Sequence, residues 1–312
     1  MKVWDGATAM TIMITINSFN MKKLLLVFLP ALLAFQGCTK DKPQDPDPSP
    51  VFTGVIEQGI ATKSTVSYDP AIMRYLVKWQ STDVVGINGA KYSVAPESPE
   101  TKATFTKVEG ETPTGTFKAC VPYNAASYDA NTESMTVTFP SSITNVPQDI
   151  SFWPMYAEST STELAFKNLS GLVAISILKT DATQKVKSIK ITSSGNYLSG
   201  TAVIDADGSA WKAVLSSGSD TITLNCGSAP LDVTSWNYAF IPVPPENYGK
   251  NFTITITYED DSTTVKKVKS GHSIVVERSK VTSIALNLYS PGSVANEDIG
   301  WGESYSDSDF TD

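Results

Sequence analysis

The chain has 312 residues and a formal net charge of −8, and it carries no basic patch or stripe of the kind that binds DNA or RNA. Its only histidine, His272, follows Gly271 in a predicted loop, which excludes a metal site built on two histidines and weakens any catalytic triad. No phosphate- or dinucleotide-binding glycine motif follows a predicted strand, and the sequence contains no CxxC pair. We therefore predict no enzymatic activity, no cofactor and no nucleic-acid partner.

Residues 1–37 have the organisation of a signal peptide. A short basic start at 21–23 precedes an apolar run of about a dozen residues at 24–35. This run is shorter than the roughly 20 apolar residues that a transmembrane helix needs. We expect Met21 to be the true start and residues 1–20 to be an upstream extension of the reading frame.

Cys38 stands directly after Gly37 at the end of this apolar run. The position resembles a lipobox, where bacterial lipoproteins are cut and the new terminal cysteine is acylated, for example with palmitate. Phe35 and Gln36 depart from the residues that are usual there. The alternative is an ordinary signal cut near Gly37, with Cys38 as a free thiol. We predict lipidation of Cys38 and, over residues 38–50, a Pro- and Asp-rich tether that stays extended.

Beyond residue 50, short runs of β-branched and aromatic residues alternate with Gly, Pro, Asn, Asp and Ser. This pattern is typical of an all-β sandwich or barrel. The run at 172–178 is largely apolar, which predicts a strand buried on both faces. The strands we expect are 51–57, 75–79, 84–87, 103–108, 115–121, 135–139, 172–178, 187–191, 201–204, 211–215, 221–224, 238–243, 252–258, 263–268, 273–277 and 281–288.

The runs group into two sets, which predicts an N-terminal β-sandwich over 51–163, a C-terminal β-sandwich over 164–290 and a tail over 291–312. Two domains of about 100–200 residues each suit this length. Cys120 and Cys226 fall on opposite sides of the boundary. A disulfide between them is chemically open to an exported protein, but we favour two separate buried thiols.

Two acidic features are candidates for ion binding. Asp205 and Asp207, followed by Gly208, faintly resemble a calcium loop, but the later glutamate and the flanking helices are missing. The cluster at 259–261 is best interpreted as the solvated tip of a hairpin. We predict no metal site at either place.

The tryptophans offer a different possibility, a stacking platform for glycans. The alternative is that tryptophans in a β-sandwich fill the core, which we favour for the first four. The residues concerned are Trp79, Trp153, Trp211, Trp236 and Trp301.

Besides Cys38 and the tether, six segments carry a resemblance to a known family. They are ATK at 61–63, VKW at 77–79, DVVGI at 83–87, FKACVPY at 117–123, FKNLSGLVAI at 166–175 and YAFIPV at 238–243. In their order and spacing these segments resemble the fimbrillins, the type V pilins and related fimbrial lipoproteins of Bacteroidales-type bacteria. The resemblance spans most of residues 38–290, and Asn168 stands where the family frequently has His.

The resemblance implies two tandem transthyretin-like β-sandwich domains in a lipoprotein that is exported to the outer membrane and assembled into, or anchoring, a fimbrium. In that family, subunits can polymerise by strand exchange with other pilin subunits after a protease removes the first strand. By analogy, cleavage near Arg74 would free residues 38–74, including the expected strand 51–57. No arginine stands in a loop directly after that strand, and we favour the alternative that Arg74 simply enters the strand at 75–79. Stalk, tip, anchor and accessory roles therefore stay open.

The tail has the alternation of a strand. Ile299, Trp301 and Tyr305 share one face at a period of two, and only Glu303 interrupts them. Such a strand can pair with an open sheet edge of a neighbouring subunit, or it can close the edge of its own domain.

Two hypotheses of function follow. The first is a structural and adhesive fimbrial subunit, anchor or accessory protein, whose further partner is a host or bacterial surface receptor. The second is a surface lipoprotein that binds glycans for nutrient capture. Exposed, coplanar aromatic side chains favour the second, whereas buried tryptophans and a removable strand favour the first.

Overall fold

The computed structural model describes residues 49–57, 67–69, 74–76, 78–144, 150, 152–178, 185–207, 210–233, 237–249, 252–268, 273–288, 304–306 and 309–311. The expected signal peptide, Cys38 and most of the tether lie outside these residues, as do His272, Trp236, Ile299 and Trp301. Within them, no helix is long and apolar enough to cross a membrane.

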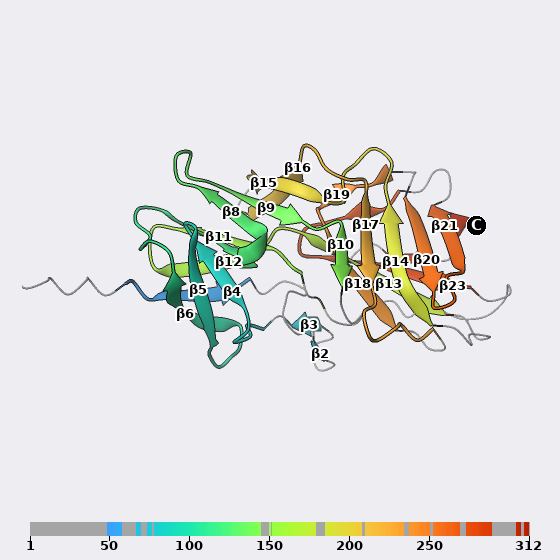
Figure 1. Cartoon of the computed structure of the whole chain (residues 1–312), viewed down its shortest axis with the longest axis horizontal. Helices are drawn as coiled ribbons and strands as arrows, with labels where there is room; N and C mark the ends of the chain where they lie inside the picture. The colour runs from blue at the N-terminus through green and yellow to red at the C-terminus, as the bar shows by residue number, and fades with distance from the viewer. Residues whose placement is uncertain are drawn as a thin grey trace, which may run out of the picture. The chain divides into compact units, whose positions relative to one another are not determined.

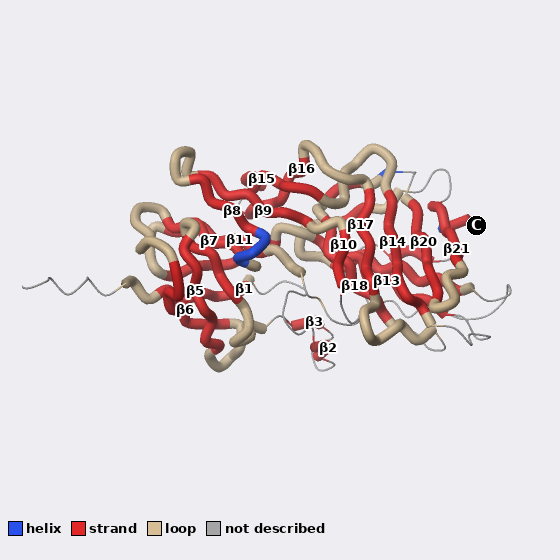
Figure 2. The backbone as a smooth tube through the Cα atoms, viewed as in Figure 1, coloured by secondary structure: helices blue, strands red, loops and turns tan. Residues whose placement is uncertain are grey.

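Strands make up most of the described chain, as the all-β prediction required (Figure 2). The elements up to residue 168 are β1 (Phe52–Ile56), β2 (Ser67–Asp69), β3 (Arg74–Leu76), β4 (Val84–Ile87), β5 (Ala90–Pro96), β6 (Lys102–Glu109), β7 (Phe117–Val121), the 3₁₀ turn η1 (Tyr123–Ala125), β8 (Ala126–Asp129), β9 (Ser134–Phe139), β10 (Ser142–Thr144), β11 (Met155–Ser159) and β12 (Glu163–Asn168).

The later elements are again all strands. They are β13 (Gly171–Leu178), β14 (Val186–Thr192), β15 (Gly200–Asp207), β16 (Ala210–Leu215), β17 (Thr221–Asn225), β18 (Tyr238–Val243), β19 (Glu246–Asn247), β20 (Thr253–Tyr258), β21 (Thr263–Val268), β22 (Val275–Val276), β23 (Val281–Asn287), β24 (Ser304–Ser306) and β25 (Phe310–Thr311).

Seven of these strands close into a barrel in the order β1-β12-β11-β7-β4-β5-β6. Strand β1 closes the ring, because it pairs antiparallel with β6 on one side and parallel with β12 on the other. A first strand in this position has no free edge, so all of its backbone hydrogen-bonding groups can be paired within the barrel.

Two further sheets are formed mainly by the second part of the chain. A six-stranded sheet has the order β10-β17-β14-β20-β21-β25, and Figure 1 shows its middle strands side by side. A four-stranded sheet, which we call the inner sheet, has the order β18-β13-β23-β24. Period-two sequences form these strands: in β20 the side chains of Ile254, Ile256 and Tyr258 are buried while the threonines between them are less covered.

Strand β13 lies between two hydrophobic cores, which explains its sequence. All of its residues are buried, as expected for the run at 172–178. Val173, Ile175 and Ile177 belong to one core, shared with the six-stranded sheet, whereas Leu172 and Ala174 belong to the core of the barrel. A strand with a core on each face has no solvated side on which polar residues would be favoured.

The motif at 166–175 spans parts of two strands. It breaks at Leu169 and Ser170 into β12, which belongs to the barrel, and β13, which belongs to the inner sheet. Because of this break, consecutive parts of one apolar segment belong to two different sheets.

Strand pairing crosses the predicted domain boundary at 163/164. Strands β8 and β9 join β15 and β16 in a four-stranded sheet of order β16-β15-β9-β8, and β10 pairs with β17. Strand β12, from the other side of the boundary, completes the barrel. The division into 51–163 and 164–290, and the transthyretin-like form of each part, stay predictions.

Candidate strand-exchange interface

Strand β1 alternates strictly between buried and exposed residues. Phe52, Gly54 and Ile56 face the barrel core, whereas Thr53 and Val55 face outward, and Val55 is 42% exposed. Backbone hydrogen bonds continue beyond the pairing at both ends, from Thr53 N to Thr162 O at 2.9 Å and from Ile56 N to Thr101 O at 3.0 Å. The strand is therefore held by main-chain bonds along both sides and by two large side chains that point inward.

At Gly54 the core lies very close to the backbone of β1. A Cβ atom at this position would lie 2.3 Å from the Cζ of Phe105 and 3.1 Å from the Cε2 of Phe166. Glycine within a strand often marks such a close approach. The rings of Phe105 and Phe166 are 5.8 Å apart and nearly perpendicular, so together they cover Gly54.

The carboxyl end of β1 is anchored by residues from a distant part of the chain. Glu57 donates its N–H to Phe166 O at 2.8 Å, and its carboxylate accepts a hydrogen bond from Arg278 Nη1 at 2.9 Å. Arg278 also donates to the Asn168 carbonyl at 3.3 Å and to Ser279 Oγ at 2.8 Å.

This cluster continues into the core through Asn168, which is 1% exposed. The buried Trp153 donates its indole N–H to Asn168 Oδ1 at 2.6 Å, and Asn168 Nδ2 donates to Ser279 Oγ at 3.2 Å. The position at which the family resemblance has a frequent His is thus the centre of a polar network between β12 and the turn before β23.

Arg74, the expected cleavage residue, begins β3. Strand β3 pairs antiparallel with β2, with Asp69 opposite Arg74, and among the described residues this two-stranded sheet joins no other. Residues 58–66 and 70–73 on either side of β2 lie outside the described residues. Whether Arg74 is cut stays a prediction.

The described parts of the tail lie at sheet edges. Strand β24 pairs parallel with β23, with Tyr305 opposite Ile284, and so forms one end of the inner sheet. Strand β25 pairs antiparallel with β21 at one end of the six-stranded sheet. Whether the tail closes edges of its own domain or transfers to another subunit stays a prediction.

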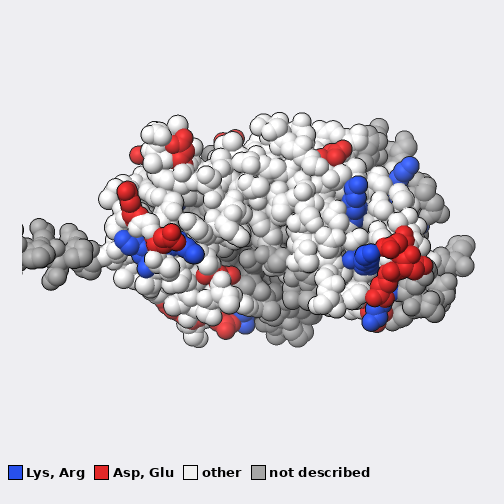
Figure 3. Space-filling view, in the orientation of Figure 1, with Lys and Arg blue, Asp and Glu red and all other residues white. Residues whose placement is uncertain are grey.

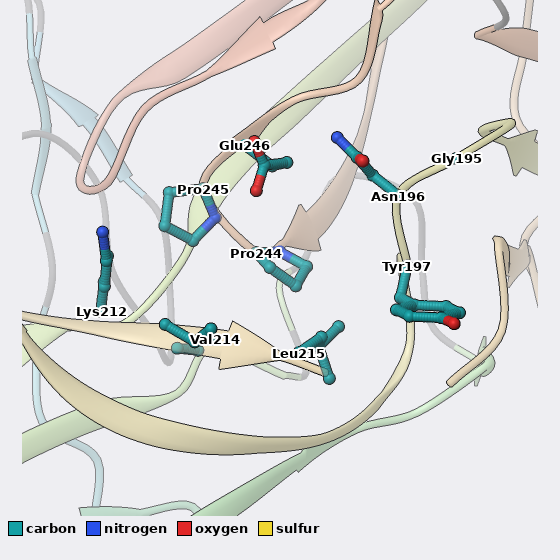
Figure 4. Close-up of a pocket in the computed structure, with 10 residues that line it drawn as sticks. Gly195, Asn196, Tyr197, Lys212, Val214, Leu215, Pro244, Pro245 and Glu246 are labelled. Atoms are coloured by element: carbon teal, nitrogen blue, oxygen red, sulfur yellow. The ribbon is translucent and has the colours of Figure 1, made fainter. Parts of the chain in front are cut away.

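Several hollows lie on the described surface. One, of about 510 Å³, lies over the outward face of β1 between β6 and β12. A second, of about 220 Å³, lies among Tyr197, Val214, Leu215, Pro244 and Pro245 (Figure 4). The second is smaller than the roughly 300–1,000 Å³ typical of ligand pockets, so it gives no candidate binding site.

The tryptophans that the structure describes do not form an exposed platform. Trp79 and Trp153 are 2% and 0% exposed, and Trp211 packs edge-on against Tyr156 beside the core. The prediction of a core role is confirmed for Trp79 and Trp153. Trp79 and Phe166 lie in the same core, with ring centroids 5.2 Å apart.

The acidic cluster at 259–261 has the environment of a solvated turn, whereas Asp205 and Asp207 lie within β15. Glu259, Asp260 and Asp261 are exposed at the β20–β21 hairpin, and Asp261 accepts a hydrogen bond from Lys187 Nζ at 2.6 Å. Figure 3 shows acidic and basic side chains together on this part of the surface. Among the described residues, no group of three or more metal-binding side chains comes together, including at Asp205.

Cys120 and Cys226 are both buried, free thiols within one hydrophobic core. Burial raises the pKa of the Cys120 thiol to about 12 and that of Cys226 to about 11. Both therefore stay protonated and unreactive at neutral pH. Their shared core differs from the separate domains that we had assigned to them.

Three residues of the interface were not singled out from the sequence. Gly54 carries a weak signal, a glycine in the middle of an otherwise alternating strand. The only sequence signal for Arg278 is its rarity, because arginine occurs just twice in the chain. Nothing in the sequence distinguishes Ser279 from the other serines.

No protein-family model and no curated protein matches the chain. Among solved structures, a Bacteroides ovatus protein provisionally assigned to cell adhesion matches 77% of this chain and 92% of its own, with a TM-score of 0.50 and 14% identity. A Bacteroides uniformis protein with the same provisional assignment matches 69% of this chain and 90% of its own, with a TM-score of 0.46 and 18% identity. The truncated tip fimbrial protein Mfa3 of Porphyromonas gingivalis matches 74% of this chain and 93% of its own, with a TM-score of 0.25 and 7% identity. The first match shows a shared all-β fold, and identities this low show the fold alone.

Proposed function

We propose that the chain is a fimbrial subunit, anchor or accessory protein, exported as a lipoprotein and held at the outer membrane through Cys38. The observation that carries the proposal is the placement of β1. Strand β1 pairs with a neighbouring strand on each side and places two large side chains in the core. Its removal would therefore leave a groove whose two flanking strands have unpaired backbone groups. Such a groove accepts an extended segment of another subunit by β-strand addition.

The fold shared with the Bacteroides ovatus protein supports this reading, and so do the buried positions of Trp79 and Trp153. A glycan-binding lipoprotein for nutrient capture would need exposed, coplanar aromatic rings. The described tryptophans offer none, so we rank that function second.

The lipid anchor is tested by fractionation of cells. Two acyl chains suffice for stable anchoring, so a Cys38→Ala variant should move from the membrane to the soluble fraction. A Cys226→Ala variant is the matched control and should stay with the membrane. A Cys38→Ala protein that remains membrane-bound would refute the lipoprotein assignment.

Maturation near Arg74 is tested by N-terminal sequencing of protein sheared from the cell surface. A new end directly after Arg74 supports removal of β1, and an Arg74→Lys variant should then keep its original end. A start at Cys38, or a blocked and lipidated end, excludes cleavage and points to an uncleaved anchor, tip or accessory role.

A further inference from the structure

The inward face of β1 has a specific pattern of side-chain sizes: large at Phe52, none at Gly54 and large at Ile56. The outward residues Thr53 and Val55 contribute little to the core. A strand that replaces β1 keeps the same backbone path between β6 and β12, so it presents three side chains to the same three places. Backbone hydrogen bonds would hold any such strand. Selection among sequences would come from the fit of its side chains at the three core positions that Phe52, Gly54 and Ile56 occupy.

The middle place cannot enlarge easily. The Phe105 and Phe166 rings that cover Gly54 are 0% exposed, and both pack edge-on against Trp79, with centroid distances of 5.3 Å and 5.2 Å. Either ring can retreat from β1 only by displacing Trp79, which is itself buried. Forcing extra atoms into a packed core of this kind is destabilising.

The tail of this chain does not have the required pattern. Its alternating face presents Ile299, Trp301 and Glu303, which puts the largest side chain at the middle place and a carboxylate at the third. In residues 289–312 no glycine has a large apolar residue two positions away on both sides. Part of this tail, β24, instead pairs with β23 of its own chain.

We propose that the groove under β1 selects a donor strand of the form large–x–Gly–x–large, and that this donor comes from a different subunit rather than from the tail of a second copy. The inference rests on the proposed strand-exchange function and specifies its partner. Filaments that contain this chain are then heteromeric at this joint.

The test uses the full chain without its signal peptide, with a specific protease site inserted within residues 58–66. After cutting, the protein is partly unfolded in urea and refolded with an excess of a labelled peptide. Mass spectrometry measures release of the native β1 fragment, and size-exclusion chromatography measures retention of the label.

Four peptides make the comparison. The first has the native sequence of residues 50–58, and the second carries Gly54→Leu. The third has the sequence of residues 297–307, and the fourth is that tail peptide with Trp301→Gly and Glu303→Ile, which introduces the required pattern.

We expect the first and fourth peptides to be retained, and the second and third to be retained at least about tenfold less, in line with the cost of overpacking. Equal retention of the native tail peptide, or of the Gly54→Leu peptide, would overturn the selectivity while leaving strand exchange intact. Failure of even the native β1 peptide would overturn the strand-exchange function and, with it, this inference.

Discussion

Arg278 Nη1 lies 2.9 Å from the carboxylate of Glu57, although 221 positions separate the two residues in the sequence. The contact joins the turn between β22 and β23 to the residue that directly follows β1. Both side chains are largely covered, at 19% and 30% exposure. Strand β1, which we propose to be exchanged, is thus held by Arg278 as well as by its neighbouring strands β6 and β12.

Replacing Arg278 should loosen β1. In an Arg278→Gln variant the free energy of unfolding should fall by about 1–2 kcal/mol, because a charge-assisted hydrogen bond in a partly covered site is lost. The matched control is Lys280→Gln, which removes a more exposed pair with Glu277 and should change stability little. Urea unfolding measures both. Equal effects for the two variants would show that Arg278 does not anchor β1.

The bond between Trp153 and Asn168 should be visible in a double-mutant cycle. Asn168→Ala leaves the buried indole N–H without its acceptor and should cost about 1–3 kcal/mol. In a Trp153→Phe background, which has no N–H, the same substitution should cost less. Additive effects in thermal unfolding would mean that the two side chains do not interact.

The two buried thiols should be protected from chemical modification as long as the protein stays folded. In a soluble chain starting at residue 39, an alkylating reagent at neutral pH should modify neither Cys120 nor Cys226 until the protein unfolds, when both react without a reductant. Mass spectrometry counts the modified thiols. Unfolded protein that needs a reductant before it reacts would reveal a disulfide instead.

The same burial makes stability fall in alkaline solution. The folded pKa of Cys120, about 12, lies above its ordinary value of 9.0, so the folded state keeps the proton more tightly. The protonated Cys120 thiol therefore makes its full contribution to folding stability below pH 9, and this contribution is lost as the pH rises toward 12. A Cys120→Ala variant should lose less stability than the wild type over that window in urea titrations. An identical loss would assign the effect to other groups.

Removal of the tail should expose sheet edges without unfolding the protein. Deletion of residues 294–312 removes β24 and β25, which pair with β23 and β21 at the ends of two sheets. We expect a folded monomer with a stronger tendency to self-associate, because open strand edges pair with one another. Circular dichroism measures whether the truncated protein is folded, and light scattering measures its self-association. An unfolded product would mean that the tail belongs to the core.

The sequence was most informative where one periodicity dominates. Strands β4, β18 and β21 begin and end where their apolar patterns predict, and the largely apolar run of β13 is buried on both faces. Strands β5 and β11 were not anticipated, because their polar residues and small side chains obscure the alternation.

Pairing between distant segments could not be predicted from the sequence. Periodicity shows that a strand has a buried face, but not which strand lies beside it. The parallel pairing of β1 with β12, the contact of Trp79 with Phe166, and the Arg278–Glu57 bond all depend on that topology. The candidate interface was therefore recognisable as a first strand and a rare arginine, but its neighbours were not.

The central claim, that this chain is built into or anchors a fimbrium, is tested most directly by immunogold electron microscopy of cells that express it. An antibody against the exposed β20–β21 hairpin provides the label, since that turn is accessible in the folded chain. We expect gold particles along filaments or at their ends or bases. A uniform coat of gold over the cell surface, with filaments unlabelled throughout, would contradict the account.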